Sequence, residues 1–324
     1  MLPTARISRL WSIGLIALML ARAAMSWLLL NDIPRLLFHE GWYFSQGGDQ
    51  HLYMQVAYSL LAGESIGTKL GVGVPLIMAA LLRLTGKLQY HDILPWLVIL
   101  NGFVLGGLSV WVMAQLTWAL TRSRWQGLAA AALWTFSAYA LWLVLGLHPE
   151  AETLRNAYLP RQLWMNGLTD APSLFMTMLG LLLAARAAGN SPPSWRRGAL
   201  FLASGIVLGL AASLRIHTLA ITGMVLLALM WTRQWRGLIL SGLGALVGLL
   251  PQFWYNAIAT GHSLNMPYVN EWLGFDREGR FYFSYTTMHF SPQFLLDSLT
   301  LLTRGNWALA VAGAATGVAA VYLF

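Results

Sequence analysis

The stretch ILPWLVILNGFVLGGLSVWVMAQLTWAL, residues 93–120, decides the fold class, because it carries no charged side chain. A second stretch, WQGLAAAALWTFSAYALWLVLGL at 125–147, follows after a short basic connection. A helix needs roughly 20 apolar residues to cross a hydrocarbon core of about 30 Å, and both stretches are long enough. The two stretches therefore predict membrane-spanning helices.

The composition of all 324 residues extends this interpretation to the whole chain. Hydrophobic residues make up 57% and charged residues 10%, and the mean hydropathy is +0.60. A soluble domain of this size needs far more polar surface, so the sequence predicts an all-α polytopic membrane protein. The absence of cysteine excludes a disulfide scaffold, a Cys-ligated zinc site and thiol catalysis. The net charge of +8 is scattered along the chain, which indicates topology signals and anionic-lipid contact rather than nucleic-acid binding.

Hydropathy and charge together predict eight spans, with the N-terminus in the cytoplasm. The spans are expected near 9–30, 94–120, 125–147, 167–185, 198–214, 218–232, 237–255 and 307–324. An alternative for the first is a signal peptide cleaved after ARA at 21–23, but the apolar run continues past it, which favours an uncleaved span. The basic connections at 122–124, 186–197 and 233–236 then all face the cytoplasm, as the positive-inside rule requires. All twelve acidic residues fall on the opposite side or at its membrane edge.

The outer segments between these spans contain two further helical patterns. We expect residues 1–324 to form one transmembrane module without a separate soluble domain, with long outer loops at 31–92 and 256–306. Within the first loop, 49–62 and 74–84 are too short or too polar to cross, and they are expected to lie at the membrane interface. In the alternative threading, 74–84 crosses the membrane, and the basic connection after the next span lies outside.

Two carboxylates stand at predicted helix starts on the outer side. Asp49 follows Gly47 and Gly48 at the head of an interfacial helix, and Asp170 opens a span just before Pro172. Helix capping explains both positions. A carboxylate at a membrane surface is also a candidate general base toward a hydroxyl group, so the functional interpretation stands beside the structural one.

Three arginines on the outer side are candidates for binding phosphate, and His217 is a further site candidate beside one of them. Arg215 and His217 interrupt an apolar stretch, where Arg215 either snorkels to the interface or clamps a phosphate with its guanidinium fork. Arg155 and Arg161 lie in the second outer loop, where simple solvation is the competing explanation. The seven histidines never adopt a metal-ligand spacing, so no built-in metal site is predicted.

Short motifs at five places together resemble a known family. They are GDQHLY at 48–53, VPLI at 74–77, LTDAPSL at 168–174, GLAASLR at 209–215, and PQFWYN at 251–256 followed by Gly261 and Tyr268. In order and spacing they resemble the GT-C fold glycosyltransferases, in particular the group of protein O-mannosyltransferases and lipid A aminoarabinose transferases. The resemblance covers most of the chain as spacing, although each motif is short.

The resemblance implies an activity and a set of site residues. The donor would be a sugar on a polyprenyl phosphate, and the acceptor a hydroxyl of a lipid, glycan or protein at the periplasmic face of a bacterial inner membrane. Asp49 would act as the general base with inversion, and Arg215 would stabilise the leaving phosphate, with a divalent cation as an optional assistant. The full set of site candidates is Asp49, Arg215, Arg155, Arg161, Asp170, His217, Glu40, His51 and Tyr268.

Departures from the family pattern keep other functions open. Family members usually carry more spans and often an outer C-terminal domain, so the resemblance implies that a chain ending at Phe324 is a minimal or truncated member. A secondary transporter or lipid flippase is the main alternative, and a non-catalytic assembly subunit is another. A transporter should place charged groups in mid-span at related helix breaks, whereas the acidic residues here collect on one side, which favours an enzyme.

Overall fold

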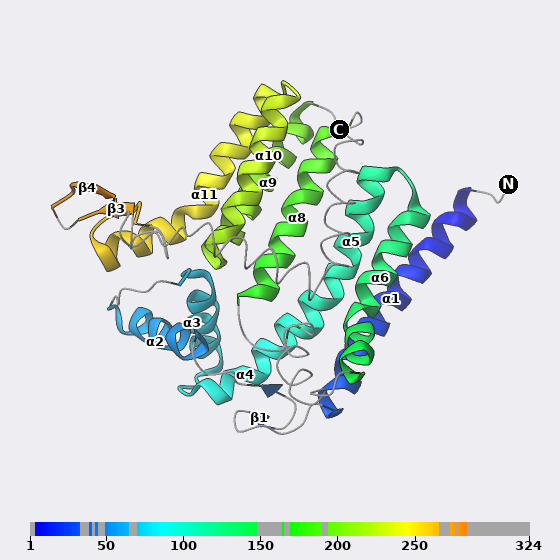
Figure 1. The fold of residues 1–324 in the computed structure, drawn as a ribbon, viewed down its shortest axis with the longest axis horizontal. Helices are drawn as coiled ribbons and strands as arrows, with labels where there is room; N and C mark the ends of the chain where they lie inside the picture. The colour runs from blue at the N-terminus through cyan, green and yellow to red at the C-terminus, as the bar shows by residue number, and fades with distance from the viewer. Residues whose placement is uncertain are drawn as a thin grey trace. The chain divides into compact units, whose positions relative to one another are not determined.

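The computed structural model describes residues 4–32, 39–40, 43–44, 49–64, 70–147, 164, 169–189, 194–265, 273–276 and 278–283. The chain divides into two compact units, Met1–Tyr268 and Val269–Phe324, which are described separately. The described part of the first unit is helical apart from one two-residue strand pair (Figure 1). The predicted all-α class therefore holds for this unit.

Five segments of the first unit are long and apolar enough to cross a membrane. They are Arg9–Leu28, Asp92–Thr121, Asp170–Ala188, Trp195–Leu214 and Trp235–Thr260. They lie in α1 (Thr4–Asp32), in the continuous run of α4 (Tyr90–Val98), the π-helix η1 (Ile99–Leu105) and α5 (Gly106–Thr121), and in α8 (Asp170–Ala188), α9 (Ser194–Leu214) and α11 (Trp235–Thr260). The fold is that of a multi-pass membrane protein.

The structure describes the three remaining predicted spans to different extents. Helix α6 (Arg124–Gly146) has 23 residues and coincides with the predicted span 125–147. The segment Ile216–Trp231, made of the 3₁₀ helix η2 (Ile216–Thr218) and α10 (Leu219–Trp231), is a shorter apolar helix. The predicted span 307–324 lies outside the described residues. The count of eight spans stays a prediction.

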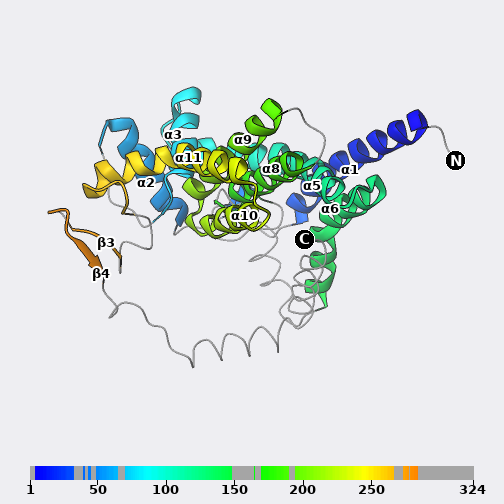
Figure 2. The same cartoon turned by 90° about the horizontal axis from the view of Figure 1, so that it is seen from above.

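Two short helices precede the second span, as the sequence predicts. Helix α2 (Asp49–Ala62) and helix α3 (Gly73–Thr85) lie side by side (Figures 1 and 2). Helix α3 ends where Gly86 adopts the left-handed conformation (φ 66°), which glycine reaches without steric cost. Both helices pack through apolar side chains on one shared core with α4, so they form a layer against the spans.

Helices α1, α5 and α6 form one group of the bundle (Figures 1 and 2). Arg22 in α1 is 2% exposed, and its Nη1 donates a hydrogen bond to the backbone carbonyl of Thr135 in α6, at 3.3 Å. A guanidinium inside a span is costly unless it finds such partners. The polar contact therefore ties α1 to α6 in the apolar interior.

Helices α9 and α11 pack in parallel with their backbones in direct contact. A β-carbon on Gly205 or Gly209 of α9 would overlap the carbonyl oxygens of Ser241 or Ala245 in α11, and one on Gly248 would overlap a carbonyl oxygen of α9. Small residues at four-residue spacing allow this close approach in membranes. We call this contact the glycine seam, defined by Gly205, Gly209, Gly244 and Gly248.

Hydrogen bonds cross the glycine seam where the backbones approach. The Ser213 hydroxyl of α9 donates to the carbonyl of Gly248 at 3.1 Å, and the Ser241 hydroxyl of α11 donates to the carbonyl of Phe201 at 3.1 Å. Both hydroxyl groups are buried. Between α8 and α9, the Ser204 hydroxyl donates to the carbonyl of Gly180 at 2.8 Å. Helices α8, α9 and α11 thus form a second tightly packed group.

The basic connections gather at one end of the bundle, which we call the basic end. It comprises the turn with Arg122 and Arg124, the start of α9 with Arg196 and Arg197, and the turn with Arg233 and Arg236 (upper part of Figure 1). The start of α1 joins this end, because the Trp11 Nε1 donates to the Arg124 carbonyl at 3.1 Å.

At the opposite end lie the ends of α1 and α9, the start of α8, and helices α2 and α3 (lower part of Figure 1). We call it the acidic end, because the described acidic residues of the first unit occur there, at positions 32, 40, 49, 64, 92 and 170. Within the described part of the first unit, these six acidic positions therefore lie at the other end of the bundle from the basic connections. Which membrane face each end occupies remains a prediction.

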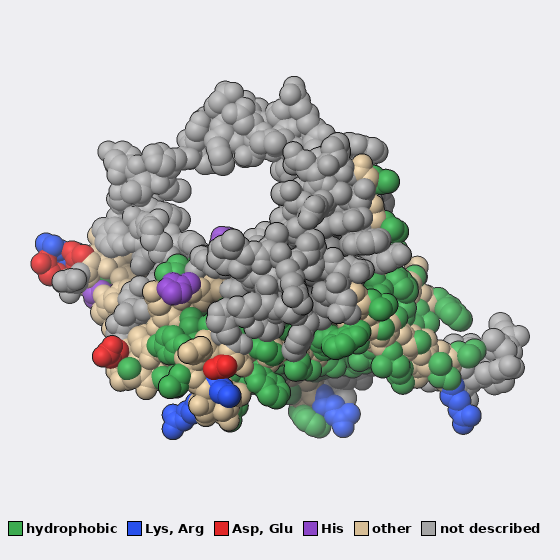
Figure 3. Space-filling view, turned by 90° about the horizontal axis from the view of Figure 1, so that it is seen from below, with side chains coloured by type: hydrophobic (Ala, Val, Ile, Leu, Met, Phe, Trp, Pro, Cys, Tyr) green, Lys and Arg blue, Asp and Glu red, His purple; other side chains and the backbone are tan. Residues whose placement is uncertain are grey.

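The surface of the bundle fits a lipid environment. Large apolar side chains on α1, α10 and α11 are widely exposed, and hydrophobic side chains form a broad band across the described surface in Figure 3. Exposed tryptophans lie close to helix ends, including Trp125, Trp195, Trp231 and Trp235 at the basic end. Because tryptophan prefers the membrane–water boundary, we expect these residues to lie near the headgroups.

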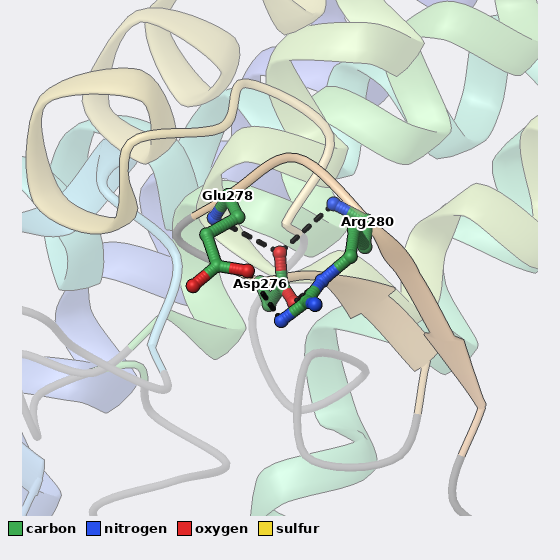
Figure 4. A network of polar contacts seen from close by, with 3 residues as sticks. All are labelled: Asp276, Glu278 and Arg280. Carbon is green, nitrogen blue, oxygen red and sulfur yellow. Dashed lines mark hydrogen bonds and ion pairs between the residues drawn. The ribbon is translucent and has the colours of Figure 1, made fainter.

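The described part of the second unit is a small hairpin of β3 (Leu273–Phe275) and β4 (Phe281–Phe283). At its turn, the Asp276 carboxylate accepts hydrogen bonds from the backbone N–H groups of Glu278 and Arg280 and from the Arg280 Nε at 2.8 Å (Figure 4). These bonds, those of Arg280 foremost, hold the pKa of the Asp276 carboxyl below its ordinary value. The Arg280 Nη2 also pairs with the Glu278 Oε2 in the same turn.

Candidate functional site

The acidic end carries an ion pair between two residues that the sequence singled out. Arg215 Nη1 contacts Asp170 Oδ1, which joins the first residue of α8 to the residue directly after α9. The side chains are 47% and 33% exposed, so solvent and ligands can reach both. The pair therefore combines a fixed position with access from outside the bundle.

Local backbone contacts hold Arg215 in place. Its N–H donates to the Ala211 carbonyl at 2.8 Å, which completes the last turn of α9. Its own carbonyl accepts bonds from the N–H and the hydroxyl of Thr218, at 3.0 and 2.9 Å. The extended conformation of Arg215 (φ −146°, ψ 107°) turns the chain from α9 into η2. The guanidinium therefore projects from a backbone that is anchored on both sides.

The segment around Gly71, between α2 and α3, packs directly beside Arg215. A β-carbon on Gly71 would lie 2.6 Å from the Ser213 carbonyl oxygen and 2.8 Å from that of Leu214, so only glycine allows this approach. The Leu214 side chain joins the core that α2, α3 and α4 share, and Met176 of α8 packs against the same core. The structure thus places three of the motif stretches, 48–53, 74–77 and 209–215, around one core through Tyr53, Val74 and Leu214.

The sequence-predicted residues of the first outer loop are described to different extents. Asp49 is the first residue of α2, as predicted, and Glu40 lies in the two-residue strand β1 (His39–Glu40), paired with β2 (Tyr43–Phe44). The side chains of Asp49 and Glu40 lie outside the described part of the structure. His51 is exposed and its Nε2 lies 3.1 Å from the Gln55 Nε2, one turn along α2.

Of the four other candidate residues, the structure describes one. His217 is exposed in η2, two residues beyond Arg215, and so belongs to the acidic end. Arg155, Arg161 and Tyr268 lie outside the described residues, and their roles stay predictions. Among the residues that the structure describes, no group of three or more His, Asp or Glu side chains could hold a metal ion. The optional divalent cation stays a prediction.

The sequence interpretation missed a buried polar network next to this site. The Gln252 Oε1 accepts a hydrogen bond from the Val72 N–H at 2.9 Å, and its Nε2 donates to the Asn256 Oδ1 at 2.7 Å. The Asn256 Nδ2 donates in turn to the Ser263 carbonyl at 3.0 Å. This chain of bonds ties the first outer segment to α11. The i, i+4 spacing of Gln252 and Asn256 on one helix face is the signal that could have identified it.

Chemically, the arrangement offers a solvent-reachable guanidinium with a carboxylate partner beside a packed outer segment. A guanidinium in this position can exchange its carboxylate for a phosphate, because both present paired oxygens to its donors. Comparison of the chain with protein-family models, with curated proteins and with solved structures found no match.

Proposed function

We propose that the protein is a membrane glycosyltransferase of the GT-C type, which transfers a sugar from a polyprenyl phosphate to a hydroxyl of a lipid, glycan or protein. The observation that carries the proposal is the exposed ion pair of Arg215 and Asp170 beside the packed helices α2 and α3. The family resemblance supplies the reaction, and the gathering of its motifs at one end supports it.

Arg215 is proposed to bind the donor phosphate. Before the donor arrives, Asp170 neutralises the guanidinium and holds it at the mouth of the site. The phosphate oxygens of the donor then replace the carboxylate oxygens on the same N–H groups. As the bond between the anomeric carbon and the phosphate oxygen breaks, negative charge grows on that oxygen, and Arg215 stabilises it.

Asp49 is proposed to act as the general base. Its carboxylate takes the proton from the acceptor hydroxyl, and the oxygen attacks the anomeric carbon from the face opposite the phosphate. One carbon–oxygen bond forms while the bond to the phosphate breaks, so the anomeric configuration inverts and polyprenyl phosphate departs. The position of Asp49 at the head of α2, which packs in the same core as Leu214, supports this assignment.

The membrane side follows from the positive-inside rule. Because the basic end collects the arginine-rich turns, we assign it to the cytoplasm, and the acidic end to the periplasm of a bacterial inner membrane. The N-terminus of α1 is then cytoplasmic. A lipid-linked donor fits this placement, since its phosphate lies at the interface where Arg215 is exposed.

The base assignment is tested with the full chain in proteoliposomes that contain a polyprenyl-phosphate sugar. Asp49→Asn is expected to lower the transfer rate by about a hundredfold or more, the usual contribution of a general base. Asp92→Asn is the matched control, because Asp92 is another carboxylate at a helix start of the acidic end. Transfer by Asp49→Asn at the parental rate contradicts the role of Asp49.

The phosphate assignment is tested by separating donor from acceptor kinetics. Arg215→Gln is expected to raise the KM for the donor by about tenfold or more and to leave the acceptor KM unchanged. Arg83→Gln, which removes an exposed arginine from α3 at the same end, serves as the control. Equal changes of both KM values would assign Arg215 a structural role instead.

One observation favours the transporter or flippase alternative. The second span contains the π-helix Ile99–Leu105 with a buried Asn101, and π-helical turns and buried polar groups occur at functional sites in membranes. This function predicts movement of polyprenyl phosphate across vesicles without acceptor turnover, and insensitivity to Asp49→Asn. Acceptor glycosylation by the purified chain would exclude it as the main activity.

A further inference from the structure

The basic end contains a cavity of about 570 Å³ whose described lining includes three arginines. Its lining residues are Arg197, Gly198, Phe201, Arg233, Gln234, Trp235, Arg236 and Gly237. None of these residues is acidic. The cavity lies between the first turns of α9 and α11 and the turn that precedes α11.

The glycine seam explains why the arginines converge. Because α9 and α11 run in parallel with their backbones in contact, both helices begin at the same end and side by side. Arg197 comes from the first turn of α9, while Arg233 and Arg236 flank the start of α11. The Arg236 guanidinium reaches across to α9, where its Nη2 would lie 3.6 Å from a β-carbon on Gly198.

Among the described residues, the three guanidinium groups have few hydrogen-bond partners. The Arg197 Nη2 donates to the Gln234 Oε1 at 3.1 Å, a neutral acceptor. Within the described chain, no carboxylate pairs with any of the three arginines, whereas Arg215 at the other end has Asp170. Like charges held around one cavity repel, and an anion in the cavity relieves that repulsion.

The backbone also places Arg233 at some cost. Its φ of 54° lies in the left-handed region, which disfavours a residue with a β-carbon. Glycine would relieve this strain at a helix end. The charge of Arg233 can therefore be removed by a substitution that should not weaken the fold.

We propose that this cavity binds the phosphate group of an anionic lipid. Arginine forks match phosphate oxygens, and Trp235 in the cavity lining is exposed, as side chains at headgroup depth are. The apolar ring of Phe201 also lines the cavity, with the Arg197 guanidinium carbon 6.0 Å from its centroid. The site is independent of the proposed transfer reaction, because it lies at the opposite end of the spans.

We favour a lipid over a free phosphate because the exposed tryptophan places the cavity at the level of the lipid headgroups. Both sources present the same phosphate oxygens, so the two are separated by experiment. The probes are short-chain phosphatidylglycerol, short-chain phosphatidylcholine and inorganic phosphate, each added to the purified full chain in a neutral detergent. Native mass spectrometry counts the bound lipid, and isothermal titration calorimetry measures the affinity for each probe.

Arg236→Gln and Arg233→Gly are each expected to lower the affinity for phosphatidylglycerol by about tenfold or more. Arg196→Gln is the matched control, because Arg196 precedes Arg197 in the chain and stacks on Trp195, 5.2 Å from the ring centroid, outside the cavity lining. This variant removes the same charge from the same end and should keep the parental affinity. A thermal midpoint for Arg233→Gly at or above that of the parent shows that the fold is retained.

The outcomes separate the possibilities. Saturable binding of one phosphatidylglycerol, much weaker binding of phosphatidylcholine, and loss in the cavity variants alone support the lipid site. Tight binding of inorganic phosphate with the same variant pattern keeps the phosphate site but overturns the lipid as its source. Equal loss in Arg196→Gln, or no binding of either anionic probe, overturns the proposal.

Discussion

The two ends of the helical bundle treat arginine in opposite ways. At the acidic end, Arg215 has a carboxylate partner in Asp170 and an anchored backbone. At the basic end, Arg197, Arg233 and Arg236 surround a cavity that has no acidic residue in its described lining. A ligand that binds Arg215 must compete with the carboxylate of Asp170. An anion in the cavity of the basic end meets no such competitor among the described lining residues.

The two proposed functions place different demands on the arginines. If the acidic end is the proposed transfer site, it must release its phosphate after each turnover, and the competing carboxylate of Asp170 makes release easier. If the basic end is the proposed lipid site, it gains from lasting occupancy, and its described lining holds no competing carboxylate. The expected effects of changing the two ends range from all-or-none labelling to a small shift in titration.

The largest effect concerns the membrane sides of the two ends. The chain has no cysteine, so a single cysteine at Ser123, between α5 and α6, or at Ser263, after α11, can be labelled selectively. We expect a membrane-impermeant thiol reagent to label Ser263→Cys in intact cells, and Ser123→Cys only after permeabilisation. Labelling of both positions from one side would invalidate the comparison, since the two ends would then not face opposite sides.

The next effect concerns the glycine seam, which connects the two ends. Gly248→Leu should destabilise the protein by about 3 kcal/mol or more, because its side chain would overlap the backbone of α9. Gly242→Leu is the control, since no atom lies within 4 Å of its β-carbon position on the same helix. Tryptophan fluorescence during denaturant unfolding in detergent measures both variants. Similar stability losses would show that backbone contact does not hold α9 to α11.

A smaller effect is expected when the carboxylate partner of Arg215 is removed, because the acidic end then has an unpaired arginine like those of the basic end. Asp170→Asn removes the competitor of Arg215, so we expect polyprenyl phosphate to bind up to about fivefold more tightly. The loss of stability should stay below about 1 kcal/mol, because both side chains are substantially exposed to solvent. Calorimetric titration of the purified protein, with Asp92→Asn as control, measures this. Weaker binding would mean that Asp170 contacts the ligand itself.

The smallest effect reports the electrostatic potential at the acidic end. Burial, and secondly the charge of Asp92, raise the pKa of the Tyr58 phenol above its ordinary value of 10.0. The folded state therefore favours the neutral phenol. The stability that this phenol contributes is present below pH 10 and is lost as the pH rises through the raised pKa. Asp92→Asn should lower this pKa, which the absorbance of tyrosinate shows when Tyr58→Phe is subtracted. An unchanged titration would mean that Asp92 does not affect Tyr58.

Much of the local structure could be predicted from the sequence. The short helices at 49–62 and 74–84 were expected from their length and polarity, and the structure has α2 and α3 at nearly the same bounds. Asp170 and Arg215 were identified because each is a charge next to an apolar run. Local patterns of this kind depend on neighbours in the chain, which the sequence displays directly.

The contacts between distant segments could not be predicted in the same way. The spacing of Gly205 and Gly209, repeated by Gly244 and Gly248, indicates close packing of helices but does not name the partner of each. The arginine cavity follows only once α9 and α11 are known to be parallel neighbours. The sequence interpretation therefore used Arg197 and Arg236 as topology signals and missed their convergence.

The glycine seam also limits how the protein can move. Where two backbones touch with no side chains between them, neither helix can turn about its axis or slide by a fraction of a turn without a clash. Helices α9 and α11 are therefore expected to move together as one rigid body. Any rearrangement at the acidic end therefore falls to elements packed against this pair, which include the segment at Gly71 and helices α2 and α3.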